Sequence, residues 1–214
     1  MSNFLTDHLI HRDNDFMVIH KPAGILSVPG KGDALFDSLL TRLVEIEPKT
    51  LLIHRLDRDT SGILVFGLNK TAQSAISRQF QERQTDKIYQ ALVVGEVYGE
   101  GLIDVPVVYD AARPPLHIAD PAHHKPAQTK WQALEQFELN GKMVTRMRLT
   151  PITGRSHQLR VHMQYIGHPI VGDTLYASLA DQQLVSRLCL HAEQLSFYHP
   201  KTGELVTFHC PVPF

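Results

Sequence analysis

The sequence predicts an α+β fold, because strand-like and helix-like segments follow one another irregularly instead of repeating as strand–helix–strand units. The N-terminal half contains both kinds of segment, and the C-terminal half is predicted to be mainly strands. The chain has 214 residues, of which 43% are hydrophobic, so it is long enough to bury a core of its own. We expect one domain over residues 1–214, with residues 1–15 as an N-terminal extension.

Two strands and two helices are expected in the first half of the chain. Residues 16–20 are rich in apolar and β-branched side chains and predict a strand, which a turn containing Pro and Gly follows. Apolar residues at mostly helical spacing predict a helix over 33–47, which ends before Pro48. The continuous apolar run at 63–68 predicts a strand buried on both faces, and a helix follows over 70–84.

The second half of the chain is predicted to contain one helix among several strands. Ser156 is a candidate N-cap for this helix, which ends near residue 165 before Gly167 and Pro169. The Pro-containing stretch at 113–126 predicts a long loop. The predicted strands are 88–94, 131–137, 143–150 and 205–210.

Composition excludes several classes of protein. No segment approaches the roughly 18 consecutive apolar residues of a membrane span. The start of the chain lacks the basic and apolar regions of a secretory signal, so we expect a cytoplasmic protein with no membrane partner. Cys189 and Cys210 are too few for a disulfide framework and lack C-x-x-C spacing, which favours reduced, buried thiols.

The net charge of −1 conceals an uneven distribution of charged residues. Residues 91–140 contain three basic and seven acidic residues, whereas 141–170 contain five basic residues and no acidic one. A positive segment of this kind is typical of a surface that binds phosphates. The alternative is an ordinary solvated face.

The densest group of charged residues, at 54–62, lies immediately before the apolar run that predicts a buried strand. It contains Asp57 between Arg55 and Arg58. Neighbouring guanidinium groups favour the ionised carboxylate, which would be a competent nucleophile or base. The alternative is a surface turn with salt bridges.

The eleven residues from 54 to 64, His-Arg-Leu-Asp-Arg-Asp-Thr-Ser-Gly-Ile-Leu, resemble the signature of the large-subunit ribosomal RNA pseudouridine synthase family. Three further segments resemble motifs of that family and follow its order: 21–24, 87–89 and 154–162. The likeness extends over nearly the whole chain from about residue 16. Within the family, 125–129 and 172–178 resemble the dual-specificity subtype, which modifies 23S ribosomal RNA and the anticodon stem-loop of certain transfer RNAs.

This resemblance implies a mixed, largely antiparallel sheet in two halves, with flanking helices and a central RNA-binding cleft. Many relatives carry an additional small RNA-binding domain at the N-terminus. The fifteen residues before the first predicted strand leave no room for one, so the chain resembles the minimal subtype, a single catalytic domain.

The resemblance also implies the reaction, isomerisation of a uridine in RNA, which requires no cofactor and no metal. Asp57 corresponds to the essential carboxylate, which either attacks the ribose or removes a sugar proton. Tyr89 corresponds to the active-site tyrosine, which stacks on the uracil and helps to remove the C5 proton; the alternative is an aromatic residue of the core. Arg155 corresponds to the basic residue that pairs with the carboxylate.

Five further side chains are predicted to bind substrate. A stacked uracil must be extruded from the RNA, and Arg55 and His54 are candidates to fill the vacancy. We expect Arg58 and His157 to contact the RNA and Arg160 to contact a phosphate. Asp59, next to Arg58, is interpreted as structural.

The expected partner is therefore RNA, 23S ribosomal RNA or transfer RNA stem-loops, and we expect no DNA binding. The composition gives no signal for an oligomer, so a monomer is the default and the oligomeric state stays open. His157 and His162 do not have the spacing of a zinc site, and we expect His123 and His124 to face RNA or solvent. Two alternatives remain: a non-catalytic RNA-binding module or RNA chaperone, and a nucleoside hydrolase that uses Asp57 and Asp59.

Overall fold

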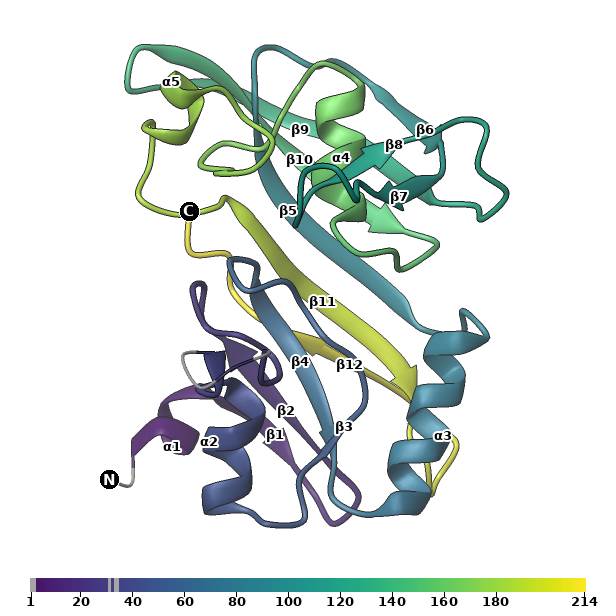
Figure 1. Cartoon of the computed structure of the whole chain (residues 1–214). Coiled ribbons are helices and arrows are strands. Elements are labelled where there is room, and N and C mark those ends of the chain that lie inside the picture. Colours follow the sequence, from purple (N-terminus) through teal and green to yellow (C-terminus); the bar gives the residue numbers. More distant parts are fainter. Residues whose placement is uncertain (1–2, 31, 33–34) are drawn as a thin grey trace. The chain divides into compact units, whose positions relative to one another are not determined.

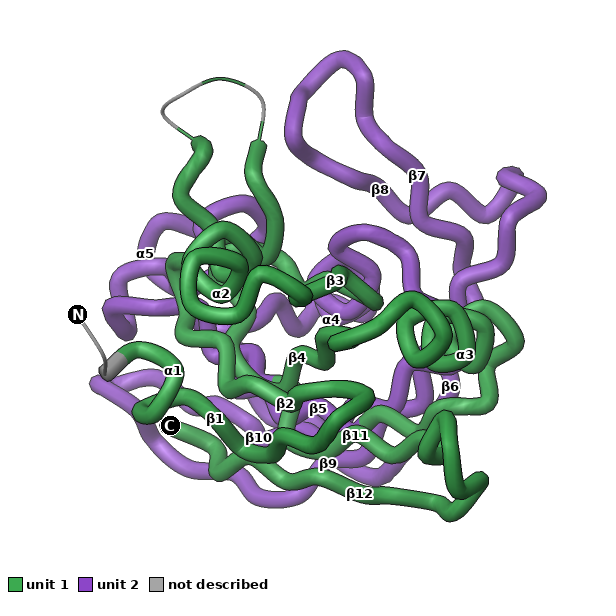
Figure 2. Tube along the Cα trace, turned by 90° about the horizontal axis from the view of Figure 1, so that it is seen from below, with its two compact units in different colours: residues 1–87, 192–213 green, residues 88–191, 214 purple. Residues whose placement is uncertain are grey.

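The computed structural model describes residues 3–30, 32 and 35–214 and divides the chain into two compact units (Figure 2). Unit 1 comprises the described residues up to Lys87 together with 192–213, and unit 2 comprises 88–191 and Phe214. The boundary between the units falls within the strands β5 (Asp86–Val94) and β11 (Leu190–Tyr198), and again before Phe214. Among the described residues, no helix is long and apolar enough to cross a membrane.

In its described residues, unit 1 is a sheet with three helices (Figure 1). Its strands are hydrogen-bonded in the order β1-β2-β4-β11, with β3 beside β4 and β12 beside β11. The register pairs of β1 with β2, β2 with β4, β3 with β4 and β11 with β12 are antiparallel. The elements are α1 (Asn3–His8), β1 (Leu9–Arg12), β2 (Phe16–Lys21), α2 (Leu39–Ile46), β3 (Leu51–Leu52), β4 (Ser61–Gly67), α3 (Lys70–Gln81), β11 (Leu190–Tyr198) and β12 (Leu205–His209).

The predicted strand that is buried on both faces is β4, in which every residue from Ser61 to Gly67 is buried. Its side chains pack with those of β2 and β11 in a core that includes Phe16, Val65 and Phe197. Helix α3 runs along β4 and β3, with its buried Ile76 in the same core. The core thus fixes the strand that begins four residues after Asp57.

Helix α2 is shorter than the predicted helix over 33–47. Its N-cap is Ser38, whose side chain accepts a hydrogen bond from the Thr41 N–H, while the Thr41 hydroxyl accepts one from the Ser38 N–H. This capping box starts the helix at Leu39. Leu35 and Phe36, which helical spacing alone had included, are exposed; residues 33 and 34 lie outside the described part of the chain.

Unit 2 contains a second antiparallel arrangement, in the order β5-β10-β9-β6, together with a separate hairpin of β7 and β8. The hairpin lies within the segment 106–119, so part of the predicted long loop at 113–126 is β-structure. The elements are β5 (Asp86–Val94), β6 (Glu100–Asp104), β7 (Val107–Tyr109), β8 (His117–Ala119), β9 (Gln128–Leu139), β10 (Lys142–Pro151), α4 (Gln158–Tyr165) and α5 (Leu179–Gln182).

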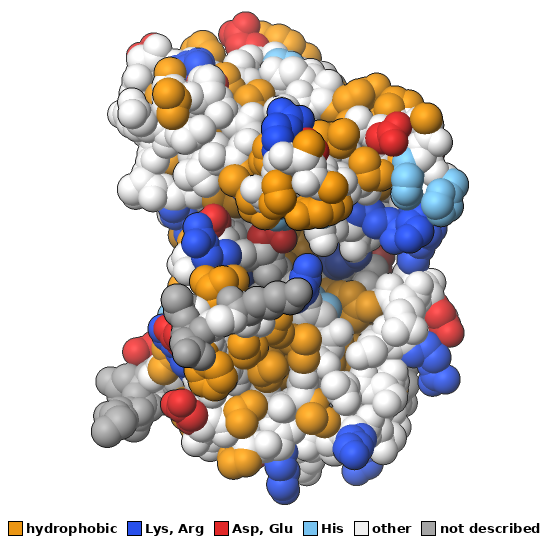
Figure 3. Space-filling model, in the orientation of Figure 1, with side chains coloured by type: hydrophobic (Ala, Val, Ile, Leu, Met, Phe, Trp, Pro, Cys, Tyr) orange, Lys and Arg blue, Asp and Glu red, His pale blue; other side chains and the backbone are white. Residues whose placement is uncertain are grey.

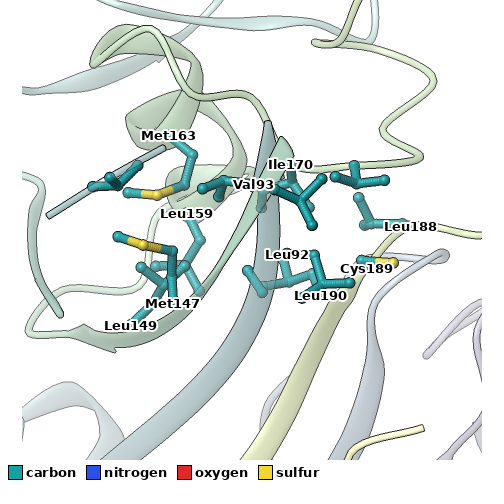
Figure 4. Packing of buried hydrophobic residues seen from close by; sticks show 14 of the residues in the cluster. Leu92, Val93, Met147, Leu149, Leu159, Met163, Ile170, Leu188, Cys189 and Leu190 are labelled. Atoms are coloured by element: carbon teal, nitrogen blue, oxygen red, sulfur yellow. The ribbon is translucent and has the colours of Figure 1, made fainter. Parts of the chain in front are cut away.

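The core of unit 2 is built where α4 packs on the sheet. Figure 4 shows Leu159 and Met163 of α4 with Met147 and Leu149 of β10. All four side chains belong to one buried cluster. This packing fixes α4 and the loop that precedes it, which contains Arg155.

Helix α4 starts differently from the prediction. Its N-cap is His157, in the left-handed conformation with φ 55°, and the side chain of His157 makes no capping hydrogen bond. Ser156 is therefore not the cap. The predicted fold class is confirmed: helices and largely antiparallel strands are mixed in both units.

Candidate active-site residues

Asp57 lies in the loop between β3 and β4, where its neighbour Leu56 anchors the backbone. The Leu56 N–H donates to Ser27 Oγ at 3.1 Å, and the Ser27 hydroxyl donates to the Leu56 carbonyl at 2.7 Å. Leu56 and Ser27 are both buried, whereas Asp57 is partly exposed. The carboxylate thus follows directly after a fixed, buried residue.

A buried lysine anchors the other side of Asp57. Lys21, the last residue of β2, is fully buried, and its Nζ donates to the carbonyls of Pro22, Ile25 and Arg58 at 2.9, 2.7 and 2.7 Å. The Gly24 N–H donates to the same Arg58 carbonyl at 3.0 Å. The segment 21–25 therefore holds the backbone immediately after Asp57.

Lys21 has no predicted role from the sequence. The available signal was a lysine at the end of an apolar strand, directly before a Pro-Gly turn. A charged side chain in that place requires partners when it is buried, but the sequence does not indicate which carbonyls supply them.

The side chain of His54 packs and forms a hydrogen bond within unit 1. Its ring stacks on Phe80 with centroids 4.3 Å apart, and its Nε2 accepts a hydrogen bond from the Val65 N–H at 3.1 Å. Burial, assisted by the positive charge of Lys87, lowers the pKa of His54 to about 3. The predicted role of His54 in filling the place of an extruded base does not fit this position, because the ring is already packed and bonded within the unit.

The two arginines that flank Asp57 are both exposed. The Arg58 guanidinium donates to both carboxylate oxygens of Asp59, at 3.0 and 3.4 Å. This ion pair agrees with the structural interpretation of Asp59. The predicted RNA contacts of Arg55 and Arg58 remain predictions.

Tyr89 lies on β5 opposite Leu149 of β10. The ring is partly buried and packs against the core of unit 2. Part of its surface therefore supports the fold and part is accessible to a ligand. Because side chains alternate along a strand, Lys87 and Tyr89 project from the same face of β5.

Arg155 lies in the loop between β10 and α4, and its side chain is exposed. Its Nε donates to the Pro126 carbonyl at 3.2 Å. Its backbone N–H donates to Oε1 of the buried Gln158 at 3.0 Å. Arg155 is thus an accessible cation on an ordered loop.

Arg160 was predicted to contact a phosphate, but its side chain is buried within unit 2. Its side chain is 3% exposed, and its Nε and terminal nitrogen donate to the two oxygens of Asp173 at 2.8 and 2.7 Å. The guanidinium lies 5.1 Å from the centre of the Tyr176 ring. The predicted phosphate contact does not fit this position, because the Arg160 side chain is buried and paired with Asp173 within unit 2.

His157 contacts the same group of residues. Its Nδ1 lies 2.7 Å from the Tyr176 hydroxyl, which also accepts the His117 N–H at 2.9 Å. The His157 and His117 rings are 4.8 Å apart. The hairpin β7–β8 is therefore linked to the start of α4, and the predicted substrate contact of His157 stays a prediction.

The predicted positive surface at 141–170 is mostly neutralised. Lys142 forms an ion pair with Asp181, and Arg146 bonds Glu135 at 2.6 Å. Together with the pair formed by Arg160, three of the five basic side chains in this segment have acidic partners. The partners lie outside the segment, so a count over 141–170 could not include them.

One cluster in the described residues has the composition of a metal site: ligand atoms of Asp13, Asp15 and His199 lie within 4.8 Å of one another. The His199 Nδ1 accepts the backbone N–H groups of Lys201 and Thr202 at 3.1 and 3.3 Å. The neutral ring therefore carries its proton on Nε2, which donates to Asp13 at 3.0 Å. In this arrangement the imidazole offers no lone pair to a cation.

The loop after β8 carries the predicted surface histidines. His124 is exposed, and the rings of His123 and His124 lie 4.6 Å apart. Figure 3 shows histidine side chains at the surface of unit 2. Their expected contact with RNA or solvent requires this exposure.

Comparisons with known proteins agree with the motifs. A family model described as RNA pseudouridylate synthase matches residues 15–165. The dual-specificity RNA pseudouridine synthase RluA of Vibrio vulnificus (strain CMCP6) is 46% identical over 208 residues, which cover 96% of this chain and 83% of that protein. The RluA of Escherichia coli (strain K12) is 43% identical over 207 residues, covering 96% and 93%.

A solved structure gives the same result at the level of the fold. Human RNA pseudouridylate synthase domain containing 1 matches with a TM-score of 0.83 and 31% sequence identity, covering 97% of this chain and 84% of that one. The extent of these matches shows that the chain belongs to the RNA pseudouridylate synthase family.

Proposed function

We propose that the chain isomerises uridine to pseudouridine in RNA with Asp57 as the catalytic carboxylate. The observation that carries the assignment is the anchoring of the loop: Ser27 holds the residue before Asp57, and Lys21 holds the residue after it. Such anchoring suits a group that must meet a reacting atom in one geometry. Asp59 lacks this role, since Arg58 holds both of its oxygens.

The proposed reaction breaks the bond between the ribose and N1 of the uracil and rejoins the same base through C5. Asp57 starts it, either by attack on the ribose or by removal of a sugar proton. Arg155 is the proposed cationic partner of the carboxylate, and an exposed planar guanidinium is suited to bidentate pairing. Tyr89 is proposed to stack on the uracil and assist removal of the C5 proton.

Extrusion of the uridine leaves a vacancy in the RNA, at a cost of a few kcal/mol. Arg55 is the proposed side chain that fills it, because it is exposed and lies two residues before Asp57. Arg58 and His157 are proposed as further RNA contacts. Every atom of the RNA is retained, so the proposed chemistry requires no redox cofactor.

The proposed substrates are 23S ribosomal RNA and transfer RNA stem-loops. This proposal rests on the likeness to proteins named dual-specificity RNA pseudouridine synthases and on the segments 125–129 and 172–178. Such substrates are consistent with the cytoplasm as the compartment. Because Asp57 belongs to unit 1 and Tyr89 and Arg155 belong to unit 2, we propose that both units act as one catalytic domain.

The test incubates the purified protein with unmodified ribosomal and transfer RNA transcripts and maps pseudouridine by carbodiimide labelling and primer extension. Asp57→Asn is the paired variant, and we expect it to bind RNA as the wild type does but to make no product. Binding without product by the wild type would favour the RNA-binding module, an alternative that gains no support from the relatives. Release of free uracil would instead indicate a hydrolase.

A further inference from the structure

A buried chain of hydrogen bonds in unit 2 ends at the backbone of Arg155. We propose that Gln158, together with Thr129 and His162, is a positioning group for Arg155, setting the direction from which its guanidinium reaches the catalytic carboxylate. This inference rests on the proposed role of Arg155. It assigns a function to three side chains that do not themselves contact the substrate.

All four hydrogen-bonding positions of the Gln158 amide are used, and the side chain is buried. Its Oε1 accepts from the Arg155 N–H at 3.0 Å and from the Thr153 hydroxyl at 2.7 Å. Its Nε2 donates to the Gln128 carbonyl at 2.9 Å and to Thr129 Oγ1 at 3.0 Å. A backbone N–H only donates and a carbonyl only accepts, so the amide has a single possible orientation.

The series of hydrogen bonds continues from Gln158 through Thr129 to His162, which is fully buried. The Val105 carbonyl lies 2.9 Å from His162 Nε2, so that nitrogen carries the proton. The His162 Nδ1 then accepts from the Thr129 hydroxyl, 2.9 Å away, which leaves the Thr129 oxygen free to accept from Gln158. Burial lowers the pKa of His162, which keeps the ring in this neutral form.

The backbone and the side chain of Arg155 are both connected to the segment 126–128, the backbone through Gln158. Gln158 bonds the Arg155 N–H and also the carbonyl of Gln128. The Arg155 Nε bonds the carbonyl of Pro126, two residues before Gln128. A free arginine side chain loses considerable rotamer entropy when it is localised. Because the Arg155 backbone N–H and Nε are already held, less of that entropy is lost in the transition state.

The experiment changes one link of the chain without altering the volume. Thr129→Val replaces the hydroxyl by a methyl group, and we expect roughly a tenfold fall in kcat with KM and RNA affinity unchanged. Thr129→Ser keeps the hydroxyl and should restore most of kcat. The matched control is Thr145→Val, which removes another buried hydroxyl of unit 2, bonded to Gly95 and Val97.

The second arm asks whether Thr129 acts through Arg155. Arg155→Lys should lower kcat, and Thr129→Val should cause little further loss in that background. Equal losses in the two backgrounds, or an equal loss in Thr145→Val, would show a general stability effect and overturn the proposal. Thermal unfolding checks each variant, and Thr153→Val, which breaks another bond to Gln158, replaces Thr129→Val if the latter does not fold.

The outcomes separate this inference from the proposed function. A fully active Arg155→Lys would remove Arg155 from the mechanism, and the positioning role with it. An impaired Arg155→Lys combined with a fully active Thr129→Val would leave the proposed function in place and reject the positioning role.

Discussion

His54, three residues before Asp57, uses one ring nitrogen to accept a hydrogen bond from the backbone of β4. Strand β3 pairs with Phe66 and Gly67 of β4, and the next N–H along that strand, that of Val65, donates to the His54 ring. A proton on Nε2 would face this N–H and abolish the bond. The ring therefore completes the hydrogen bonding of β4 only while it is neutral.

We predict that His54 makes the protein less stable in mild acid. The pKa is lowered from 6.5 to about 3 by burial, so as the pH falls below about 6.5 the unfolded chain binds a proton that the folded chain does not. The free energy of unfolding should thus decrease from about pH 7 to 5, and His162, whose pKa is also lowered by burial, should add to the effect. Urea denaturation across this range should show a shallower dependence for His54→Gln, and an unchanged slope would contradict the assignment.

We predict that both cysteines are unreactive in the folded protein. Cys189 and Cys210 are buried, and burial raises the pKa of each thiol to about 11. The thiolate is the reactive form, so a disulfide reagent should label the native protein slowly and the urea-unfolded protein fast, at two thiols per chain. Rapid native labelling at either position would contradict its burial.

At the scale of the elements, the loop between β3 and β4 depends on a contact made from the end of β2. Lys21→Met should fill the same space but leave the carbonyls of Pro22 and Ile25 without this donor. We predict a loss of about 2 kcal/mol or more in the free energy of unfolding, the penalty for unsatisfied buried acceptors. The control Lys70→Met changes an exposed lysine on α3 and should lie within about 0.5 kcal/mol of wild type.

Both Lys21 and Lys70 variants are also assayed for pseudouridine formation under conditions where they remain folded. Reduced product from Lys21→Met alone would connect the anchoring of the loop to catalysis. A Lys21→Met protein as stable and active as wild type would show that the loop holds its conformation without the lysine.

The start of β4 requires a glycine for a reason of packing. Gly62 has a φ of +118°, and a Cβ there would lie 2.3 Å from the Ala192 carbonyl oxygen and 2.5 Å from its nitrogen. Gly203 also has a positive φ, +74°, but a Cβ there would meet nothing within 4 Å. We predict that Gly203→Ala costs about 1 kcal/mol and Gly62→Ala roughly 3 kcal/mol, because the second adds a backbone clash to the strain. Equal melting shifts would exclude that clash.

At the scale of the whole molecule, the pairing of charges decides how RNA binding responds to salt. Lys142 and Arg146 are engaged by Asp181 and Glu135. We predict that Lys142→Gln and Arg146→Gln leave the slope of log affinity against log salt unchanged. If residues 141–170 bound phosphates through these side chains, each substitution would reduce the slope by about 0.7 to 0.9. Filter binding at several salt concentrations distinguishes the two results.

Among the described residues, the sequence indicated the longer helices and about half of the strands, whereas the short elements α1, β1, β3, β6, β7, β8 and α5 were not predicted. The all-buried β4 was visible as a continuous apolar run, and β2, β5, β9 and β10 were recognisable from their composition. Strand β11 was missed because polar residues interrupt its pattern, and two of them, His191 and Ser196, are buried. The predicted start of the 33–47 helix was wrong, because the spacing of apolar residues does not show that the Ser38 cap begins the helix at Leu39.

The sequence alone was sufficient for the family and the reaction. The motif around Asp57 and the segments 21–24, 87–89 and 154–162 are local patterns of residues that can be read directly from the chain. The tertiary structure decided which charged and polar side chains remain available. Arg160 is bonded to Asp173, thirteen residues away, whereas Arg155 stays exposed, and Lys21 meets the carbonyl of Arg58, thirty-seven residues away. These partners come together only when separate strands and helices pack, so no local pattern could distinguish an arginine in a buried ion pair from one that stays exposed.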